Sequence, residues 1–480
     1  MSGTFPAGLG SAFDRLSNFT KQIDIVYPDR KDAVIHQSRI RVKLNANSLV
    51  NLRSLKMYYQ FTTPQAGLAV GGTQIGRYHP RYSSSIIQDI AMYFNNNLIS
   101  SINEYNLLYN TLGDLTMGNN QKAKRYLENL DPSVKFLGEA NIGNNDEVIT
   151  LIYPTRQSVA GTDNSDTNRQ FVINNFINFL GNASTEYLNT NITGDFELAI
   201  TLAPATIVWQ AYIHPTAGNA AHLAAPAVPT YTLNNIYFTY ERVILNDPLY
   251  DNLISSQVNS PEGLKICFTE YSTHIGPLQT RDINYSFNTS ASSLDNIICT
   301  TRRADYQTVG PLLTTGGGIA AGNPYELDLI TTGNNSFNQS TYFRRDLLSL
   351  GTSQIEINGT QMYKRPLTKF EIYQETLNAI SPSDDIVSNV HPGLNSINSF
   401  LKYYFAHILS LNYNGETKVP TISGLDGRGS NFSILWKVSN SETIPAIVAG
   451  AGYSQVYPVV FCAKSQVLQI NAGQQHAIMI

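Results

Sequence analysis

Apolar and polar residues alternate along much of the chain, which predicts a protein built mainly of β-strands. In Ile40–Leu44 and Phe196–Leu202 nearly every second side chain is apolar, as expected when successive side chains of a strand point to opposite faces of a sheet. Similar runs predict further strands at Ile23–Tyr27, Leu55–Phe61, Ile87–Phe94, Phe171–Leu180, Ile236–Leu245, Leu264–Phe268, 431–438 and 459–470.

Two stretches, Gln88–Leu115 and Gln354–Ile380, share a second pattern. In each, an extended run passes through an Asn-containing turn into a segment whose apolar residues recur at steps of three or four, the period of one helical face. The pattern predicts one amphipathic helix in each stretch. The residues predicted to line the two apolar faces are Ile102, Tyr105, Leu108 and Leu112 in the first and Leu367, Phe370, Tyr373 and Leu377 in the second.

These stretches belong to a longer internal repeat. Four pairs of matching positions occur in the same order in both halves of the chain. The pairs are Leu49 with Leu294 (294 − 49 = 245), Leu112 with Leu377 (377 − 112 = 265), Phe196 with Phe432 (432 − 196 = 236) and Val243 with Val467 (467 − 243 = 224). The separation changes only across turn-rich segments, as expected for two homologous domains with different surface loops.

We therefore expect an all-β chain of two domains, residues 21–246 and 262–480, joined by a linker at 247–261 and preceded by an arm at 1–20. Each domain has about eight strands, long loops and one flanking helix, which fits a jelly-roll β-sandwich. A generic Greek-key sandwich is the alternative that periodicity leaves open. The arm carries a short apolar face that could contact a neighbour or a membrane, or could be a frayed terminus. Its residues are Phe13, Leu16 and Phe19.

Composition narrows the function classes. Only 14% of the 480 residues are charged, below the roughly 25% of an average soluble protein, whereas 28 tyrosines suit strands and surfaces covered by neighbours. The net charge of −4 offers no basic field, so we expect no direct nucleic-acid binding. The chain has neither a signal-peptide pattern nor an apolar run of about eighteen residues, so synthesis in a reducing, cytosol-like compartment is expected.

No constellation of residues predicts catalysis, a metal site or a cofactor. Asp426 is a single acid in a glycine-rich turn, too little for calcium. His274 and His407 lie in apolar contexts that are typical of core residues. The three isolated cysteines are predicted to be small buried hydrophobes, and two basic pairs are predicted to be solvated loop ends. These residues are Cys267, Cys299, Cys462, Arg302–Arg303 and Arg344–Arg345.

Several motifs, none of which contains an invariant catalytic signature, occur in order from about Ile23 to the end of the chain. Together they resemble one known family. They are QIEINGTQMYKRPLTKFEIYQETL, FINFLGNASTEYLNTNITGDFELAITLAPATIVW, SGLDGRGSNFSILWKV and CAKSQVLQINAGQQHAIMI. The chain resembles the double jelly-roll major capsid proteins of tailless icosahedral DNA viruses of the adenovirus-related lineage. Within that lineage it most resembles the major capsid proteins of polinton-like viruses and virophages.

The resemblance implies a non-enzymatic structural subunit of the virion shell, made in the host cytoplasm. Proteins of this kind form homotrimers whose six jelly rolls give a pseudo-hexagonal tile. Expected partners are neighbouring tiles, minor capsid or penton proteins and, through the arm, an internal membrane where the virus has one. Segments 116–170, 208–229 and 305–342 are candidates for outward loops. The alternatives are a carbohydrate-binding β-sandwich, a fibre-type attachment protein and a β-sandwich hydrolase.

Overall fold

The protein is represented by a computed structural model. The structure describes residues 19–44, 48–62, 73–77, 82–116, 170–213, 230–245, 248–261, 263–304, 341–343, 345, 347, 349–380, 397, 400–401, 404–412, 424–428, 431–441, 455–471 and 475–479. The predicted arm residues Phe13 and Leu16 lie outside these ranges, as do most of the three predicted outward loops.

The first half of the chain forms two antiparallel sheets and a separate two-stranded ribbon. Its strands are β1 (Phe19–Val26), β2 (Val34–Ile35), β3 (Arg39–Lys43), β4 (Leu49–Asn51), β5 (Lys56–Thr62), β6 (Thr73–Arg77), β7 (Ile87–Phe94), β8 (Asn97–Ile102), β9 (Gln170–Ile173), β10 (Tyr187–Asn189), β11 (Phe196–Leu202), β12 (Trp209–Ile213) and β13 (Thr232–Leu245). Its helices are α2 (Tyr105–Thr116), α5 (Phe179–Asn182) and α6 (Thr190–Thr193), with 3₁₀ turns η1 (Leu52–Ser54), η2 (Ser83–Ile86) and η4 (Ala205–Val208).

The second half forms two more antiparallel sheets. Helix α7 (Pro248–Val258) lies before them, within the segment predicted as a linker. The strands are β14 (Leu264–Ile275), β15 (Ile283–Thr289), β16 (Ser293–Arg303), β17 (Leu350–Ile357), β18 (Thr360–Gln361), β19 (Leu367–Thr368), β20 (His407–Ser410), β21 (Leu425–Asp426), β22 (Phe432–Asn440), β23 (Val456–Asn471) and β24 (Gln475–Met479). The 3₁₀ turn η5 (Thr341–Phe343) and helix α9 (Lys369–Ile380) complete this half.

The two halves have the same strand order. In the first half, β1 pairs with β13, which pairs with the broken strand β4–β5, and β5 pairs with β9; the second half repeats this as β14-β23-β16-β20. The facing sheets are β3-β11-β7-β8 and β15-β22-β17, the latter extended by β18 and β19. Every strand pairing among the described residues stays within one half. The chain is therefore two tandem eight-stranded jelly-roll sandwiches, as predicted.

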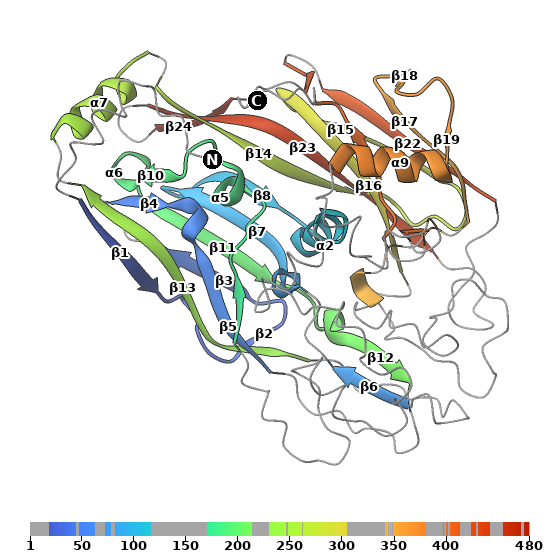
Figure 1. The fold of residues 1–480 in the computed structure, drawn as a ribbon, viewed down its shortest axis with the longest axis horizontal. Helices are drawn as coiled ribbons and strands as arrows, with labels where there is room; N and C mark the ends of the chain where they lie inside the picture. Colours follow the sequence, from blue (N-terminus) through green and yellow to red (C-terminus); the bar gives the residue numbers. More distant parts are fainter. Residues whose placement is uncertain are drawn as a thin grey trace.

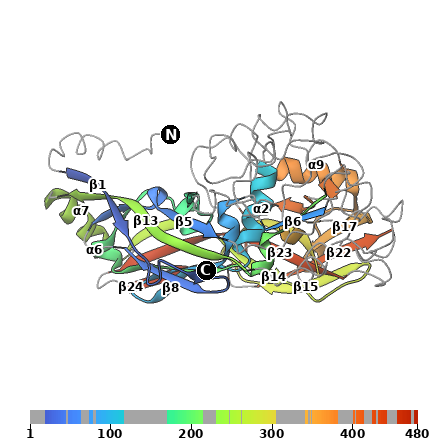
Figure 2. The same cartoon turned by 90° about the horizontal axis from the view of Figure 1, so that it is seen from below.

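The two sandwiches lie side by side, with α2 between them (Figure 1). β1 lies at one end of the molecule and α9 near the other, an arrangement that is also seen in the second view (Figure 2). The two flanking helices occupy the same place in the order of elements. α2 follows the paired strands β7 and β8, and α9 follows the paired strands β17 and β18 and the short strand β19. α2 packs on η2 and β7, and α9 packs on β20, β17 and β19.

Some sequence predictions match element bounds and others need correction. The strands predicted at Ile87–Phe94 and Phe196–Leu202 are β7 and β11. The strand predicted over Phe171–Leu180 is wrong beyond Ile173, because the chain turns into α5. Asn178 begins that helix by accepting a hydrogen bond from the N–H of Leu180 through its side chain.

Candidate functional site

The described residues bring one unusual set of groups together where the two sandwiches meet. We call this contact the seam. On its first-half side the seam comprises Ser101–Asp114 and Phe179–Ser184; on its second-half side it comprises Cys267–Thr273, Arg302, Tyr342 and Arg345. The first-half residues come from β8, α2 and α5, and the second-half residues from β14, the end of β16 and the η5 region.

Backbone and side-chain hydrogen bonds join the facing edges β8 and β14. Glu270 accepts from the N–H of Ser101 at 3.4 Å, and the hydroxyl of Thr273 donates to the carbonyl of Asn103 at 2.6 Å. Farther along β14, the N–H of Ser184 donates to the carbonyl of Cys267 at 2.7 Å. These bonds satisfy polar groups that an uncovered sheet edge would leave to water or to a foreign strand.

Arg302, the penultimate residue of β16, reaches across the seam. Its Nη1 lies 2.6 Å from Oε2 of Glu104, and its guanidinium lies 4.4 Å from the ring centroid of Tyr342, whose hydroxyl it also contacts. Glu104 directly precedes α2 and has a φ of 54°, a left-handed conformation that costs a residue with a Cβ free energy. The N–H of Glu104 donates to Asp89 at 3.2 Å, so both the backbone and the side chain of Glu104 are held.

A second ion pair crosses the seam with no access to solvent. Nη2 of Arg345 lies 2.9 Å from Oδ2 of Asp114, and both side chains are 0% exposed. The hydroxyl of Tyr82 donates to the other carboxylate oxygen at 2.8 Å, and Nη1 of Arg345 donates to the carbonyl of Phe343 at 3.3 Å. A buried pair of this kind adds little net stability but makes the loss of either partner costly, so it favours one arrangement of the two sandwiches.

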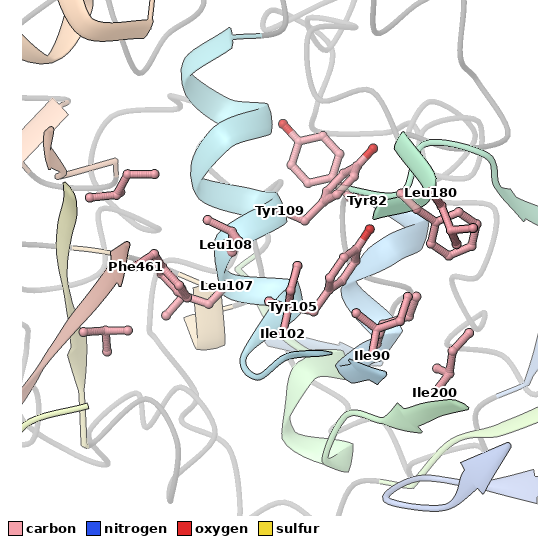
Figure 3. Close-up of a cluster of buried hydrophobic side chains, with 14 of the residues drawn as sticks. Tyr82, Ile90, Ile102, Tyr105, Leu107, Leu108, Tyr109, Leu180, Ile200 and Phe461 are labelled. Atoms are coloured by element: carbon pink, nitrogen blue, oxygen red, sulfur yellow. The ribbon is translucent and has the colours of Figure 1, made fainter. Parts of the chain in front are cut away.

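Apolar contacts surround these polar groups. Phe179 of α5 packs edge-on against Phe268 of β14, with ring centroids 5.1 Å apart. Leu107 of α2 lies beside Phe461 of β23, whereas Tyr105 and Tyr109 lie toward Tyr82 of the first sandwich (Figure 3). α2 is therefore covered on both sides, which explains why nearly all its residues are buried.

Two carboxyl groups near the seam are shifted toward their neutral forms. Burial raises the pKa of Glu270, and the N–H of Ser101 opposes this shift only in part. Burial likewise raises the pKa of Asp89, against the effect of the N–H donated by Glu104. Both shifts result from desolvation, which disfavours a charged carboxylate.

The structure corrects the interpretation of the two basic pairs. Arg302, Arg303 and Arg345 are buried, so the prediction of solvated loop ends was wrong for these three residues, whereas Arg344 lies outside the described residues. Sequence alone could not identify the partners, because Glu104 and Arg302 are 198 residues apart and Asp114 and Arg345 are 231 apart. A usable signal was the position of Arg302 in the same strand as the apolar run Ile297–Cys299, two threonines after it, in a chain with few charges.

The predicted helix faces are also revised. Ile102 and Leu367 lie in β8 and β19 rather than in helices. Tyr105 and Leu108 are buried, and Leu112, Tyr373 and Leu377 are half-buried against the core. Phe370 is 62% exposed, so its assignment to a buried face was wrong. The buried side of α9 is set by Ile372 and Thr376, and at about 100° per residue Phe370 lies on the opposite side from Ile372.

The other candidate residues are not part of the seam. His407 is buried, with its Nδ1 2.9 Å from the hydroxyl of Ser353, and burial lowers its pKa to about 4. The serine–histidine pair therefore sits in the core, where a substrate has no access. His274 stacks on Phe287 with ring centroids 4.3 Å apart, and Asp426 pairs with Arg428 on the surface at 2.7 Å.

The described residues contain no group of three or more His, Cys, Asp or Glu side chains placed to hold a metal ion. All three cysteines are free thiols, with Cys299 and Cys462 buried and Cys267 partly exposed. Among the helices of the described ranges, none combines the length and apolar character needed to cross a membrane.

Comparison by sequence finds no matching family model and no matching curated protein. Comparison by structure finds likeness over almost the whole chain. The "PBCV-1 virus capsid, quasi-atomic model" matches with a TM-score of 0.55 at 11% identity, over 97% of this chain and 98% of that chain. PBCV-1 VP54 fitted into a reconstruction of the virophage Sputnik gives 0.53 at 10% identity, over 97% and 98%.

A third structure, of the Sputnik virophage itself, matches with a TM-score of 0.52 at 9% identity. The match covers 96% of this chain and 88% of that chain. At such identities the likeness concerns the fold, and its coverage includes both sandwiches. The resemblance expected from the sequence is thus confirmed at the level of the fold: this chain has the double jelly-roll fold of the viral major capsid lineage.

Proposed function

We propose that this chain is the major structural subunit of an icosahedral virus capsid and has no catalytic role. The observation that carries the proposal is the structural match to a capsid model over 97% of the chain, a share that includes both sandwiches. The seam supports it, since a shell component has to keep its two halves in one arrangement, and two buried ion pairs resist any other.

The assembled form proposed is a homotrimer that acts as a pseudo-hexagonal tile and joins neighbouring tiles and minor capsid or penton proteins in the virion. Two domains are proposed, at 21–246 and 262–480, with a linker at 247–261. Residues 1–20 are proposed as an arm that contacts neighbours or an internal membrane. Large apolar side chains exposed on both sandwiches, Ile23 on the first and Phe370 on the second, support self-association.

Light scattering and negative-stain microscopy on the purified protein test this function together. We expect a particle of three times 53.1 kDa and hexagonal outlines that pack edge to edge. A monomer at micromolar concentration would contradict the proposal. Glycan-array binding by a chain that never assembles would instead favour the attachment-protein alternative.

A further inference from the structure

Helix α9 is tied to β20 on either side of a buried histidine. The hydroxyl of Thr376 donates to the carbonyl of Ala406 at 2.8 Å and accepts from the N–H of Ile408 at 3.4 Å. These two residues flank His407, whose side chain is 0% exposed. Among the described strands β20 pairs only with β16, so it lies at the edge of its sheet, and α9 packs on it. A change at His407 therefore acts directly on the attachment of α9.

Hydrogen bonds hold the ring of His407 in its neutral form. The indole N–H of Trp436 donates to the hydroxyl oxygen of Ser353 at 2.9 Å, and Nδ1 of His407 lies 2.9 Å from the same oxygen. Because an indole can only donate, the serine accepts from Trp436 and has its own proton left for Nδ1. Nδ1 is then the acceptor and Nε2 carries the ring proton. Nε2 has no hydrogen-bond partner among the described residues.

The ionisable groups that face the ring do not favour a positive charge. Cys299 of β16 lies directly opposite His407, and the ring of Tyr363 stacks on it with centroids 6.5 Å apart. Burial raises the pKa of the Cys299 thiol and of the Tyr363 phenol, so both stay neutral in acid. The nearby acid of α9, Glu375, is hydrogen-bonded to Tyr363. Burial accordingly lowers the pKa of His407 to about 4.

We propose that His407 is an acid-sensitive latch that releases α9 from the second sandwich. When the ring takes up a proton, Nδ1 becomes a donor, and the Ser353 oxygen then faces two N–H donors. The buried imidazolium is stabilised by contact with water, which reaches it when β20 separates from β16. A four-residue edge strand is the part of the sheet that opens at the lowest cost. Because the residues on both sides of His407 are bound to Thr376, α9 moves with the strand.

The opening is expected over a defined range of pH. The closed form binds the proton with a pKa of about 4, whereas the ordinary value of 6.5 applies once the ring is in water. The equilibrium constant for opening should therefore rise about tenfold for each unit by which pH falls from 6.5 to 4, and level off below 4. Glu371 in the first turn of α9 stays charged throughout, since hydrogen bonds from Thr368 and Arg365 hold its pKa at about 2.

Hydrogen exchange of backbone amides between pH 7 and pH 4, followed by mass spectrometry, tests the latch on the whole chain. Protection factors are corrected for the intrinsic effect of pH on exchange, and β11 of the first sandwich serves as the internal reference. We expect the protection of α9 and β20 to fall together by about 300-fold relative to β11, which is tenfold per unit over 2.5 units.

His407→Gln removes the titrating ring but keeps an oxygen that can accept from Ser353, so we expect the protection of α9 to become independent of pH. His407→Phe, which keeps an aromatic ring, is the second variant if the first does not fold. His274→Gln is the matched control. Burial also lowers the pKa of His274 to about 4, but that ring lies on β14, stacked on Phe287 and near Lys464. Glu375→Gln controls for the nearby acid, and both controls should keep the fall.

Each outcome decides the inference. A wild-type chain whose α9 and β20 keep the same protection relative to β11 from pH 7 to pH 4 would overturn it. So would a fall that persists without the ring of His407, or one that either control substitution abolishes. A fall that is lost only with His407 would establish the latch. The inference concerns a single chain, so its failure and the failure of the proposed assembly are separate results.

Discussion

The two sandwiches have one strand order but differ in how their equivalent surfaces are covered. α2 has a sandwich on each side, whereas α9 has its own sandwich on one side and solvent at Phe370. The edge strand β14 is covered by α5 and β8, whereas its equivalent β1 exposes Ile23. The burial of a side chain in this protein thus depends on whether the other sandwich covers that side, as well as on the sequence pattern of its own sandwich.

The largest expected effect comes from breaking the ion pair that only the α2 side possesses. Arg345→Met removes the cation that lies 2.9 Å from the buried Asp114 carboxylate, and the free energy of unfolding should fall by about 3–5 kcal/mol. Urea denaturation measures this loss. Arg428→Met, which removes the surface partner of Asp426, should leave the midpoint unchanged.

A double variant sharpens this prediction. Adding Asp114→Leu to Arg345→Met removes both buried charges, and most of the lost stability should return. A single variant that is as stable as the wild type would show that the buried pair does not hold the seam.

The next effect compares a buried and an exposed apolar residue on the two edge strands β14 and β1. Phe268→Ala should cost about 3 kcal/mol because it empties a packed site. Ile23→Ala should change stability by less than about 0.5 kcal/mol, as is usual at exposed positions. Equal losses in thermal or urea unfolding would contradict the assigned difference in cover.

A smaller loss of stability is expected when a buried threonine hydroxyl is removed, and it should differ between α9 and α2. Thr376 of α9 donates to the carbonyl of Ala406 at 2.8 Å and accepts from the N–H of Ile408 at 3.4 Å, so it ties the helix to β20. Thr376→Val should cost about 1–2 kcal/mol because it leaves a buried carbonyl without this donor. Thr111, which bonds only Leu107 of its own helix at 2.7 Å, is the control, and Thr111→Val should cost less.

The smallest expected effect is a change in the free energy of unfolding with pH, caused by Glu270 in the seam. Burial raises the pKa of Glu270 above its ordinary value of 4.5, so the folded chain holds this proton more tightly than the unfolded chain. The free energy of unfolding should therefore fall as pH rises from 4.5 to the raised folded value, and then level off. Glu270→Gln should remove that slope, so the stability of the variant relative to the wild type should grow across this window. Parallel pH curves would contradict the assignment.

Sequence patterns predicted the strands and the repeat well because both are local properties. The alternation of apolar and polar residues in a run such as Phe196–Leu202 can be read from the run alone, and its bounds match β11. α5 was missed because four residues are too few to show a helical period. Ile102 and Leu367 were placed in helices because an apolar residue at a strand–helix junction fits both periods.

The seam could not be predicted from the sequence. Its ion pairs join residues about two hundred positions apart, and no local pattern says which arginine meets which acid. Phe370 failed for a related reason: the sequence shows an apolar position but not which side of the helix the sandwich covers.

The long separation between Asp114 and Arg345 has a consequence during synthesis. The carboxylate of Asp114 emerges from the ribosome 231 residues before its arginine, which at roughly 5–20 residues per second means a delay of about 10–50 s. During that interval one side of α2 in the nascent first sandwich is not yet covered by the second sandwich. Newly made chains are then the form most exposed to wrong partners, and holding chaperones would act on them before any shell exists.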